Sequence, residues 1–117
     1  MRELVRVSKS LCDETRIRML KLLTEKDICV CEMHEIYPMS HSQVSRNLKA
    51  LMDAGFLKRW REGKCVVYVA DKDASTGYCH EALEILVDSF NDSETVLRDK
   101  AKLQKAIEDG IREKKKH

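Results

Sequence analysis

A helix start, a helix stop and a hairpin follow one another between residues 40 and 69, and this succession constrains the fold more than any other feature. Ser40 and Gln43 stand at the two positions of a capping box, in which a serine caps the helix and a glutamine reaches back to it. Gly55 is the left-handed residue that commonly ends a helix. The pattern therefore predicts one helix of about 15 residues, opened by Ser40.

A basic β-hairpin is predicted directly after this helix. Residues 56–61 form one strand, Glu62-Gly63 the turn, and residues 64–69 the second strand. Upstream, Asp13 is a good N-cap for a helix with a regular apolar stripe, and Pro38 stops a shorter one. The other predicted elements are helices over 3–11, 30–37, 77–91 and 93–113, a short extended piece over 28–30, and a polar loop over 71–76.

Short helices, a tight turn, a capped helix and a hairpin in this order predict a mostly α fold with a small β-hairpin wing, the winged helix-turn-helix. The 117 residues suffice for one domain. We expect residues 1–92 to form the winged DNA-binding domain and residues 93–117 to form a C-terminal helical extension and basic tail.

Composition excludes several classes of protein. Charged residues make up 36% of the chain, and no apolar run approaches the ~20 residues of a membrane span. The first residues lack the apolar core of a signal peptide, which predicts a cytoplasmic protein. No nucleophile–base constellation and no glycine-rich phosphate loop are evident, so we expect the chain not to be an enzyme.

Charge is distributed unevenly along the chain. Residues 40–70 carry six basic and two acidic side chains, whereas residues 71–99 carry two basic and eight acidic ones. A basic helix beside a basic hairpin is suited to double-stranded DNA. The predicted DNA-contacting residues are His41, Ser42, Gln43, Ser45, Arg46 and Lys49 on the helix, and Arg61 and Lys64 on the hairpin. The alternatives are an ordinary solvated surface and a winged helix that binds a protein partner.

These residues resemble the ArsR/SmtB family of bacterial and archaeal metal-responsive repressors, in particular its arsenical-resistance type. The resemblance is clearest where the recognition helix and its exit are expected. The matching segments are Ser10–Leu20, Ile28–Met33, Ser40–Leu57, Arg61–Lys64 and Tyr68. It implies a winged helix-turn-helix that binds operator DNA and forms a homodimer through its first and last helices. Apolar stripes over residues 4–11 and 83–90 agree with such a dimer.

The five cysteines are too few for a disulfide scaffold, and an odd number cannot all pair within the chain. We expect free thiols in a reducing cytosol. Cys12 and Cys79 are interpreted as small buried hydrophobic residues. The roles of these two and of Cys65 stay open.

Cys29 and Cys31 resemble the family's thiol sensor for arsenite and related soft ions. The sequence gives an independent indication, because Glu32 follows Cys29 at capping-box spacing, where serine or threonine would be the usual cap. A broken local rule is typical of functional sites. The helix dipole at this end is expected to lower the thiol pKa and so favour the metal-binding thiolate.

The family's strongest sensor has a third cysteine where this chain has His34. The predicted metal ligands are therefore Cys29, Cys31 and His34. Arsenite or antimonite is the expected inducer, with zinc or cadmium as alternatives that suit His34 better. Cys12, Cys65 or Cys79 could equally supply a third sulfur. No cofactor is expected to be needed for folding.

A mechanism follows from the spacing of the two thiols. Residues i and i+2 of a regular helix point about 200° apart, so they cannot both grip one ion. We therefore expect ion binding to unwind the first turn of this helix and release DNA by displacing the recognition helix. The competing hypothesis keeps the DNA-binding fold and makes the thiols a redox switch, with Cys29 or Cys31 pairing with a distant thiol.

Overall fold

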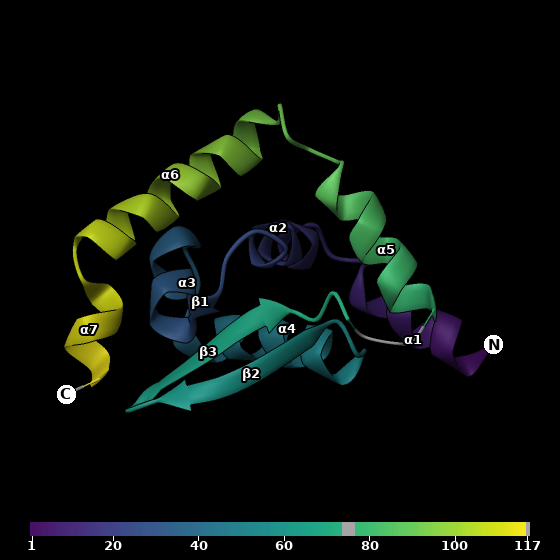
Figure 1. The fold of residues 1–117 in the computed structure, drawn as a ribbon, viewed down its shortest axis with the longest axis horizontal. Coiled ribbons are helices and arrows are strands. Elements are labelled where there is room, and N and C mark those ends of the chain that lie inside the picture. Colours follow the sequence, from purple (N-terminus) through teal and green to yellow (C-terminus); the bar gives the residue numbers. More distant parts are fainter. Residues whose placement is uncertain (74–76, 117) are drawn as a thin grey trace.

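The computed structural model describes residues 1–73 and 77–116 and forms a helical body with a small sheet on one side (Figure 1). The predicted loop residues 74–76 and the terminal His117 lie outside the described part. The helices are α1 (Arg2–Ser10), α2 (Glu14–Leu23), α3 (Val30–Ile36), α4 (His41–Asp53), α5 (Gly77–Val87), α6 (Glu94–Glu108) and α7 (Ile111–Lys116), and the strands are β1 (Ile28–Cys29), β2 (Leu57–Glu62) and β3 (Cys65–Ala70).

The helix-turn-helix consists of α3 and α4. The caps predicted for α2 and for α4 are both present. Asp13 caps α2 by accepting a hydrogen bond from the Arg16 backbone N–H at 3.2 Å. Ser40 and Gln43 form the predicted capping box of α4. Gly55, with φ 98°, lies directly after this helix in the left-handed region, where a glycine carries no steric penalty. Side-chain caps and a left-handed glycine within a few residues of each helix end therefore determine these limits.

The sheet has three antiparallel strands in the order β1-β3-β2. In the hairpin Glu62 pairs with Cys65, so Gly63 and Lys64 form the turn, one residue later than predicted. The extended piece before α3 is a third strand, in which Ile28 pairs with Tyr68 and Cys29 with Val67. The sequence indicated an extended segment there but gave no partner for it.

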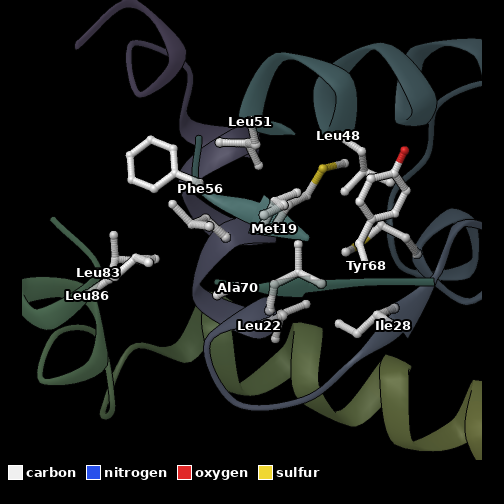
Figure 2. Packing of buried hydrophobic residues seen from close by; sticks show 14 of the residues in the cluster. Met19, Leu22, Ile28, Leu48, Leu51, Phe56, Tyr68, Ala70, Leu83 and Leu86 are labelled. Carbon is white, nitrogen blue, oxygen red and sulfur yellow. The ribbon is translucent and has the colours of Figure 1, made fainter. Parts of the chain in front are cut away.

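The main apolar core lies between the helices and the sheet. Figure 2 shows Met19 of α2 in its centre, with Leu48 and Leu51 of α4 to one side and Ala70 of β3 to the other. Met19, Leu48 and Leu51 are fully buried. Because α2 and α3 pack against one side of α4, the opposite face of this helix is exposed.

The C-terminal segment packs back onto the winged domain. Asp99 of α6 is almost fully buried and accepts 2.9 and 2.7 Å hydrogen bonds from the Arg18 guanidinium of α2. The Tyr37 hydroxyl, at the end of α3, donates to the same carboxylate at 3.3 Å. Arg18 also lies over the Tyr37 ring, 5.0 Å from its centroid. Asp99 thus ties α6 to both α2 and α3.

Two predictions about the C-terminal half are wrong. The single helix expected over 93–113 is broken at Gly110, whose φ of 68° is left-handed, and α7 turns back beside α3 (Figure 1). The expected helix over 77–91 ends at Val87. There the buried Lys21 ammonium donates to the carbonyls of Leu86 at 2.9 Å and Val87 at 3.1 Å, which caps the C-terminus of α5.

No helix in the described part of the chain is long and apolar enough to span a membrane.

Candidate functional site

The exposed side of α4 carries the predicted DNA-contacting residues. The exposed side chains are His41, Ser42, Gln43, Ser45, Arg46 and Lys49, and the buried ones are Val44, Leu48 and Leu51. Thirteen residues give a helix about 20 Å long, at ~1.5 Å per residue. A polar helix of this size can lie in a DNA major groove.

Two of these side chains already have intrahelical partners. The Gln43 carbonyl oxygen accepts the Ser40 backbone N–H at 2.9 Å, so its amide N–H groups are the part that can face a base. Lys49 forms an exposed ion pair with Asp53, one turn along, at 3.0 Å. Such a solvated pair contributes little stability, so Lys49 can exchange Asp53 for a phosphate at small cost.

His34 lies beside α4, the predicted recognition helix. Its ring stacks on that of His41, with centroids 3.7 Å apart and planes 29° from parallel. His34 was predicted to join Cys29 and Cys31 as a metal ligand. In the described residues no group of three histidine, cysteine or acidic side chains is arranged to hold a metal ion, so these three do not form a ready site.

The wing places basic side chains at its tip and along one strand. Arg61 and Lys64, both predicted, are exposed next to the turn. Arg59 is also exposed, and because strand side chains alternate it shares a face with Arg61. The Arg59 guanidinium donates a hydrogen bond to the Tyr68 hydroxyl at 3.3 Å. Sequence reasoning omitted Arg59, although the period of two would have found it.

Cys29 is the N-cap of α3. Its sulfur accepts the backbone N–H of Glu32 at 3.3 Å, and the Glu32 carboxylate accepts the backbone N–H of Cys29 at 2.9 Å. The capping box inferred from the spacing is therefore complete, with a thiol in place of a hydroxyl.

The prediction that Cys29 has a lowered pKa is wrong. Its side chain is fully buried, and burial raises the thiol pKa to about 12, with only partial compensation from the Glu32 backbone N–H. Loss of water disfavours the charged form more than the helix terminus favours it. Cys29 is therefore a neutral thiol at neutral pH.

Cys29 belongs to a small second cluster under the wing. Its other buried members are Cys65 and Val67 of β3, and the half-buried Cys31 packs against them. Val67 is the residue paired with Cys29, and Cys65 lies two positions away on the same face of β3. The sequence left the place of Cys65 open, and the structure places it in this thiol cluster.

Arg112 of α7 closes the cluster at one end. Its guanidinium donates to Glu32 at 2.8 Å and to the Asp27 carboxylate at 3.0 Å. Its backbone carbonyl accepts the Cys65 S–H at 3.5 Å. Burial opposes the charge of Arg112, but its bonds to Glu32 and Asp27 outweigh that cost and raise its pKa. Nothing in the sequence pattern pointed to Arg112, since its partners lie 47 to 85 positions away.

The two remaining cysteines differ from each other. Cys79 is fully buried and donates to the Ala54 carbonyl at 3.1 Å, which confirms its packing role. Cys12 is exposed, so its interpretation as a buried residue is wrong. It follows the last turn of α1, where it lies in the wall of a pocket of about 480 Å³.

The outer faces of α1 and α5 carry exposed apolar side chains. The two helices lie side by side (Figure 1). The exposed large apolar residues there are Leu4 and Val5 on α1, and Tyr78, Ile85 and Val87 on α5, with Ile85 67% exposed. Large exposed apolar side chains on two adjacent helices are typical of an interaction site.

Known proteins resemble this chain in sequence. The family model described as bacterial regulatory protein, arsR family, matches residues 13–59. The arsenic resistance transcriptional regulator ArsR1 of Pseudomonas putida is 41% identical over 53% of this chain and 49% of its own length. The cadmium resistance regulatory protein CadC homolog of Staphylococcus aureus is 33% identical over 61% and 60%. The chain thus spans about half to three-fifths of these relatives.

Solved structures share the fold. Reduced HlyU from Vibrio cholerae superimposes with a TM-score of 0.60 at 25% identity, over 72% of this chain and 84% of that one. A homodimeric winged helix-turn-helix DNA-binding domain of Mycobacterium bovis, described as a possible ArsR-family regulator, also gives 0.60, at 24% identity over 72% and 74%. The fold is accordingly the predicted winged helix-turn-helix.

A further relative is matched over a larger share of its length. The arsenic resistance transcriptional regulator ArsR2 of Pseudomonas putida is 35% identical over 80 residues, which are 68% of this chain and 69% of that protein. Together with the family model and the capped helix and wing described above, this match shows that the chain belongs to the ArsR family of bacterial regulatory proteins.

Proposed function

We propose that this protein is a homodimeric, sequence-specific DNA-binding transcriptional repressor, acting in the cytoplasm. The observation that carries the proposal is the exposed polar and basic face of α4 beside the arginines of the wing. Side chains near the start of α4 would contact base edges, and the wing would contact a flanking phosphate or the minor groove. Its relatives are named as regulators of arsenic and cadmium resistance.

A homodimer is supported by the apolar side chains of α1 and α5. Pairing these faces across a two-fold axis would remove the exposed apolar surface from water in both copies at once. Two recognition helices would then meet two half-sites on one DNA duplex.

DNA binding is tested by gel shift on the DNA upstream of the protein's own gene, at several salt concentrations. Arg46→Ala should weaken binding, whereas Arg98→Ala, which changes an exposed arginine of α6, should not. Loss of affinity with rising salt is expected because arginine–phosphate contacts release counterions. If duplex DNA gives no salt-dependent shift, the protein-partner alternative is favoured instead.

We infer further that a thiophilic ion bound through Cys29 and Cys31 releases the operator, with arsenite or antimonite as the expected inducer. Support comes from the cap: the Cys29 sulfur that would bind an ion is the atom that accepts the Glu32 N–H at 3.3 Å. Ion binding would therefore compete with the first-turn cap of α3, and such a cap is worth about 0.5–2 kcal/mol in a typical helix. Since α3 packs against α4, loosening α3 would displace the reading surface.

The inducer is identified by adding arsenite, antimonite, cadmium and zinc in turn to the preformed protein–DNA complex. Release by the first two supports a purely thiol site. Release only by zinc or cadmium supports a site that includes His34. Release only after mild oxidation, reversed by a reductant, would establish the redox alternative.

A further inference from the structure

The thiol cluster under the wing contains one more sulfur than the sensor motif. Cys65 lies on β3, 36 positions after Cys29, and both thiols are buried in one cluster with Val67 while Cys31 packs against it. Figure 1 shows how this comes about: β1, which ends at Cys29, and the start of α3 lie beside β3. Three thiols from two distant segments are thus gathered beside the start of α3.

The pairing register favours an ion over a disulfide between Cys29 and Cys65. Cys29 pairs with Val67, which makes Cys65 its diagonal neighbour. Diagonal residues across antiparallel strands are ~7–8 Å apart, more than the ~4.4–6.8 Å between Cα atoms that an unstrained disulfide needs. An ion bound between two sulfurs bridges a wider gap, because each metal–sulfur bond adds about 2.3 Å.

We propose that Cys65 of the wing is the third thiolate ligand of the inducer, completing a three-sulfur site with Cys29 and Cys31. This rests on the proposed function, in which a thiophilic ion binds the latter two. Cys12 and Cys79 are excluded by their places in the fold, since neither belongs to the cluster and Cys79 is bonded to the Ala54 carbonyl.

The chemistry balances without any oxidant or reductant. Arsenous acid carries three hydroxyl groups on one trivalent arsenic atom. Each cysteine S–H forms one arsenic–sulfur bond, and its proton leaves with one hydroxyl group as water. Three thiols therefore bind one arsenic atom and release three water molecules, whereas a two-thiol adduct keeps one hydroxyl group.

Ion binding would compete with hydrogen bonds that Cys29 and Cys65 make in the structure. In the described residues the three sulfurs are not placed as a ready ligand set. The Cys29 sulfur is engaged with the Glu32 N–H at 3.3 Å, and Cys65 donates to the Arg112 carbonyl at 3.5 Å. Ligation by both sulfurs would remove the cap of α3 and one contact of α7 together. The site would thus couple the wing, α3 and the C-terminal helix.

Native mass spectrometry of the full chain with sodium arsenite tests the proposal. The wild-type adduct should correspond to arsenous acid minus three waters. Cys65→Ser should give an adduct one water heavier and bind arsenite at least about tenfold more weakly, since even changes outside the ligand shell cost roughly 10–100-fold. Cys79→Ser, a matched change of another buried thiol, should behave as wild type.

A double variant makes the test independent of how well Cys65→Ser folds. Cys12→Ser with Cys79→Ser leaves Cys29, Cys31 and Cys65 in place, and it should still lose three waters. A two-thiol adduct in wild type or in this double variant would overturn the role of Cys65, as would an unchanged three-thiol adduct in folded Cys65→Ser. If wild type forms no arsenite adduct, the arsenite sensing in the proposed function is itself contradicted.

Discussion

Arg112 and Cys29 meet on the same oxygen atom of Glu32. That carboxylate oxygen accepts the Arg112 guanidinium at 2.8 and 3.2 Å and the Cys29 backbone N–H at 2.9 Å. The Glu32 side chain is only 4% exposed, so these donors replace the water that the carboxylate loses on burial. Through Glu32, Arg112 of α7 therefore stabilises the capping box at the start of α3.

Arg112→Gln should lower the free energy of unfolding by roughly 1–3 kcal/mol, because it leaves a buried carboxylate with weaker partners. Urea unfolding followed by circular dichroism measures this. Hydrogen exchange should speed up in α7 and in the first turn of α3. Arg98→Gln on the exposed side of α6 is the control, and equal losses in the two variants would show that the bonds of Arg112 to Glu32 add no stability.

Lys21→Met should destabilise the protein by about 1–3 kcal/mol, although methionine is the more hydrophobic residue. The buried ammonium donates to two carbonyls at the end of α5 and to the Asn91 side chain at 2.8 Å, and methionine can donate to none of them. Thermal unfolding compares it with Lys102→Met, an exposed change on α6. A variant as stable as wild type would show that water replaces the ammonium there.

The burial of Cys29 predicts a loss of stability in alkali. Its pKa is 9.0 in an ordinary environment and about 12 in the folded protein. Between these values the unfolded chain loses a proton that the folded protein keeps, so stability falls as pH rises. The slope due to this one group approaches about 1.4 kcal/mol per pH unit.

The measurement is the wild-type free energy of unfolding minus that of Cys29→Ser, at several pH values from about 8, below the ordinary pKa, to about 11, below the pKa of the folded protein. The difference should be constant near pH 8 and shrink above pH 9. Other alkaline groups are common to both proteins and cancel. A difference independent of pH would mean that the thiol is better solvated than its burial indicates.

Arg59→Ala should weaken binding to any DNA sequence and reduce the salt slope of log affinity by about 1, as expected for one lost phosphate contact. Lys58→Ala is the matched control, because Lys58 is exposed on the opposite face of the same strand. A gel-shift series in salt separates the two. The same slope loss in both variants would point to general charge attraction instead of a defined wing contact.

Ile85→Glu should convert the proposed homodimer to a monomer, as measured by light scattering after size-exclusion chromatography. Ile85 is 67% exposed on α5, so a charge there costs the folded monomer little but would be buried unpaired in the dimer. Leu97→Glu places the same charge on an exposed site of α6, 49% exposed, and should leave the dimer intact. The reverse result would move the interface to α6.

Local chemistry made much of this fold predictable. Ser40, Gln43 and Gly55 determine the limits of α4 through contacts within a few positions, and the structure confirms them. Such signals are complete within a short window of sequence. The break at Gly110 was missed because an isolated glycine inside a helical pattern is often tolerated.

The thiol site was predictable only in part. The spacing of Cys29 and Glu32 revealed the cap, but the pKa of Cys29 depends on its burial against Cys65 and Val67 of β3, which come from a distant part of the chain. Cys65 and Arg112 could not be assigned for the same reason. Pairing between distant segments determines which side chains meet, and a single sequence does not give that pairing.

The thiol cap makes the opening of α3 directly measurable. Cys29 is fully buried, so an alkylating reagent reaches its sulfur only in molecules whose first turn of α3 has come apart. Cys12 is exposed and reports the intrinsic speed of the same reaction in the same sample. The ratio of the two alkylation rates therefore gives the population of the open helix from the protein's own thiols, with no DNA present.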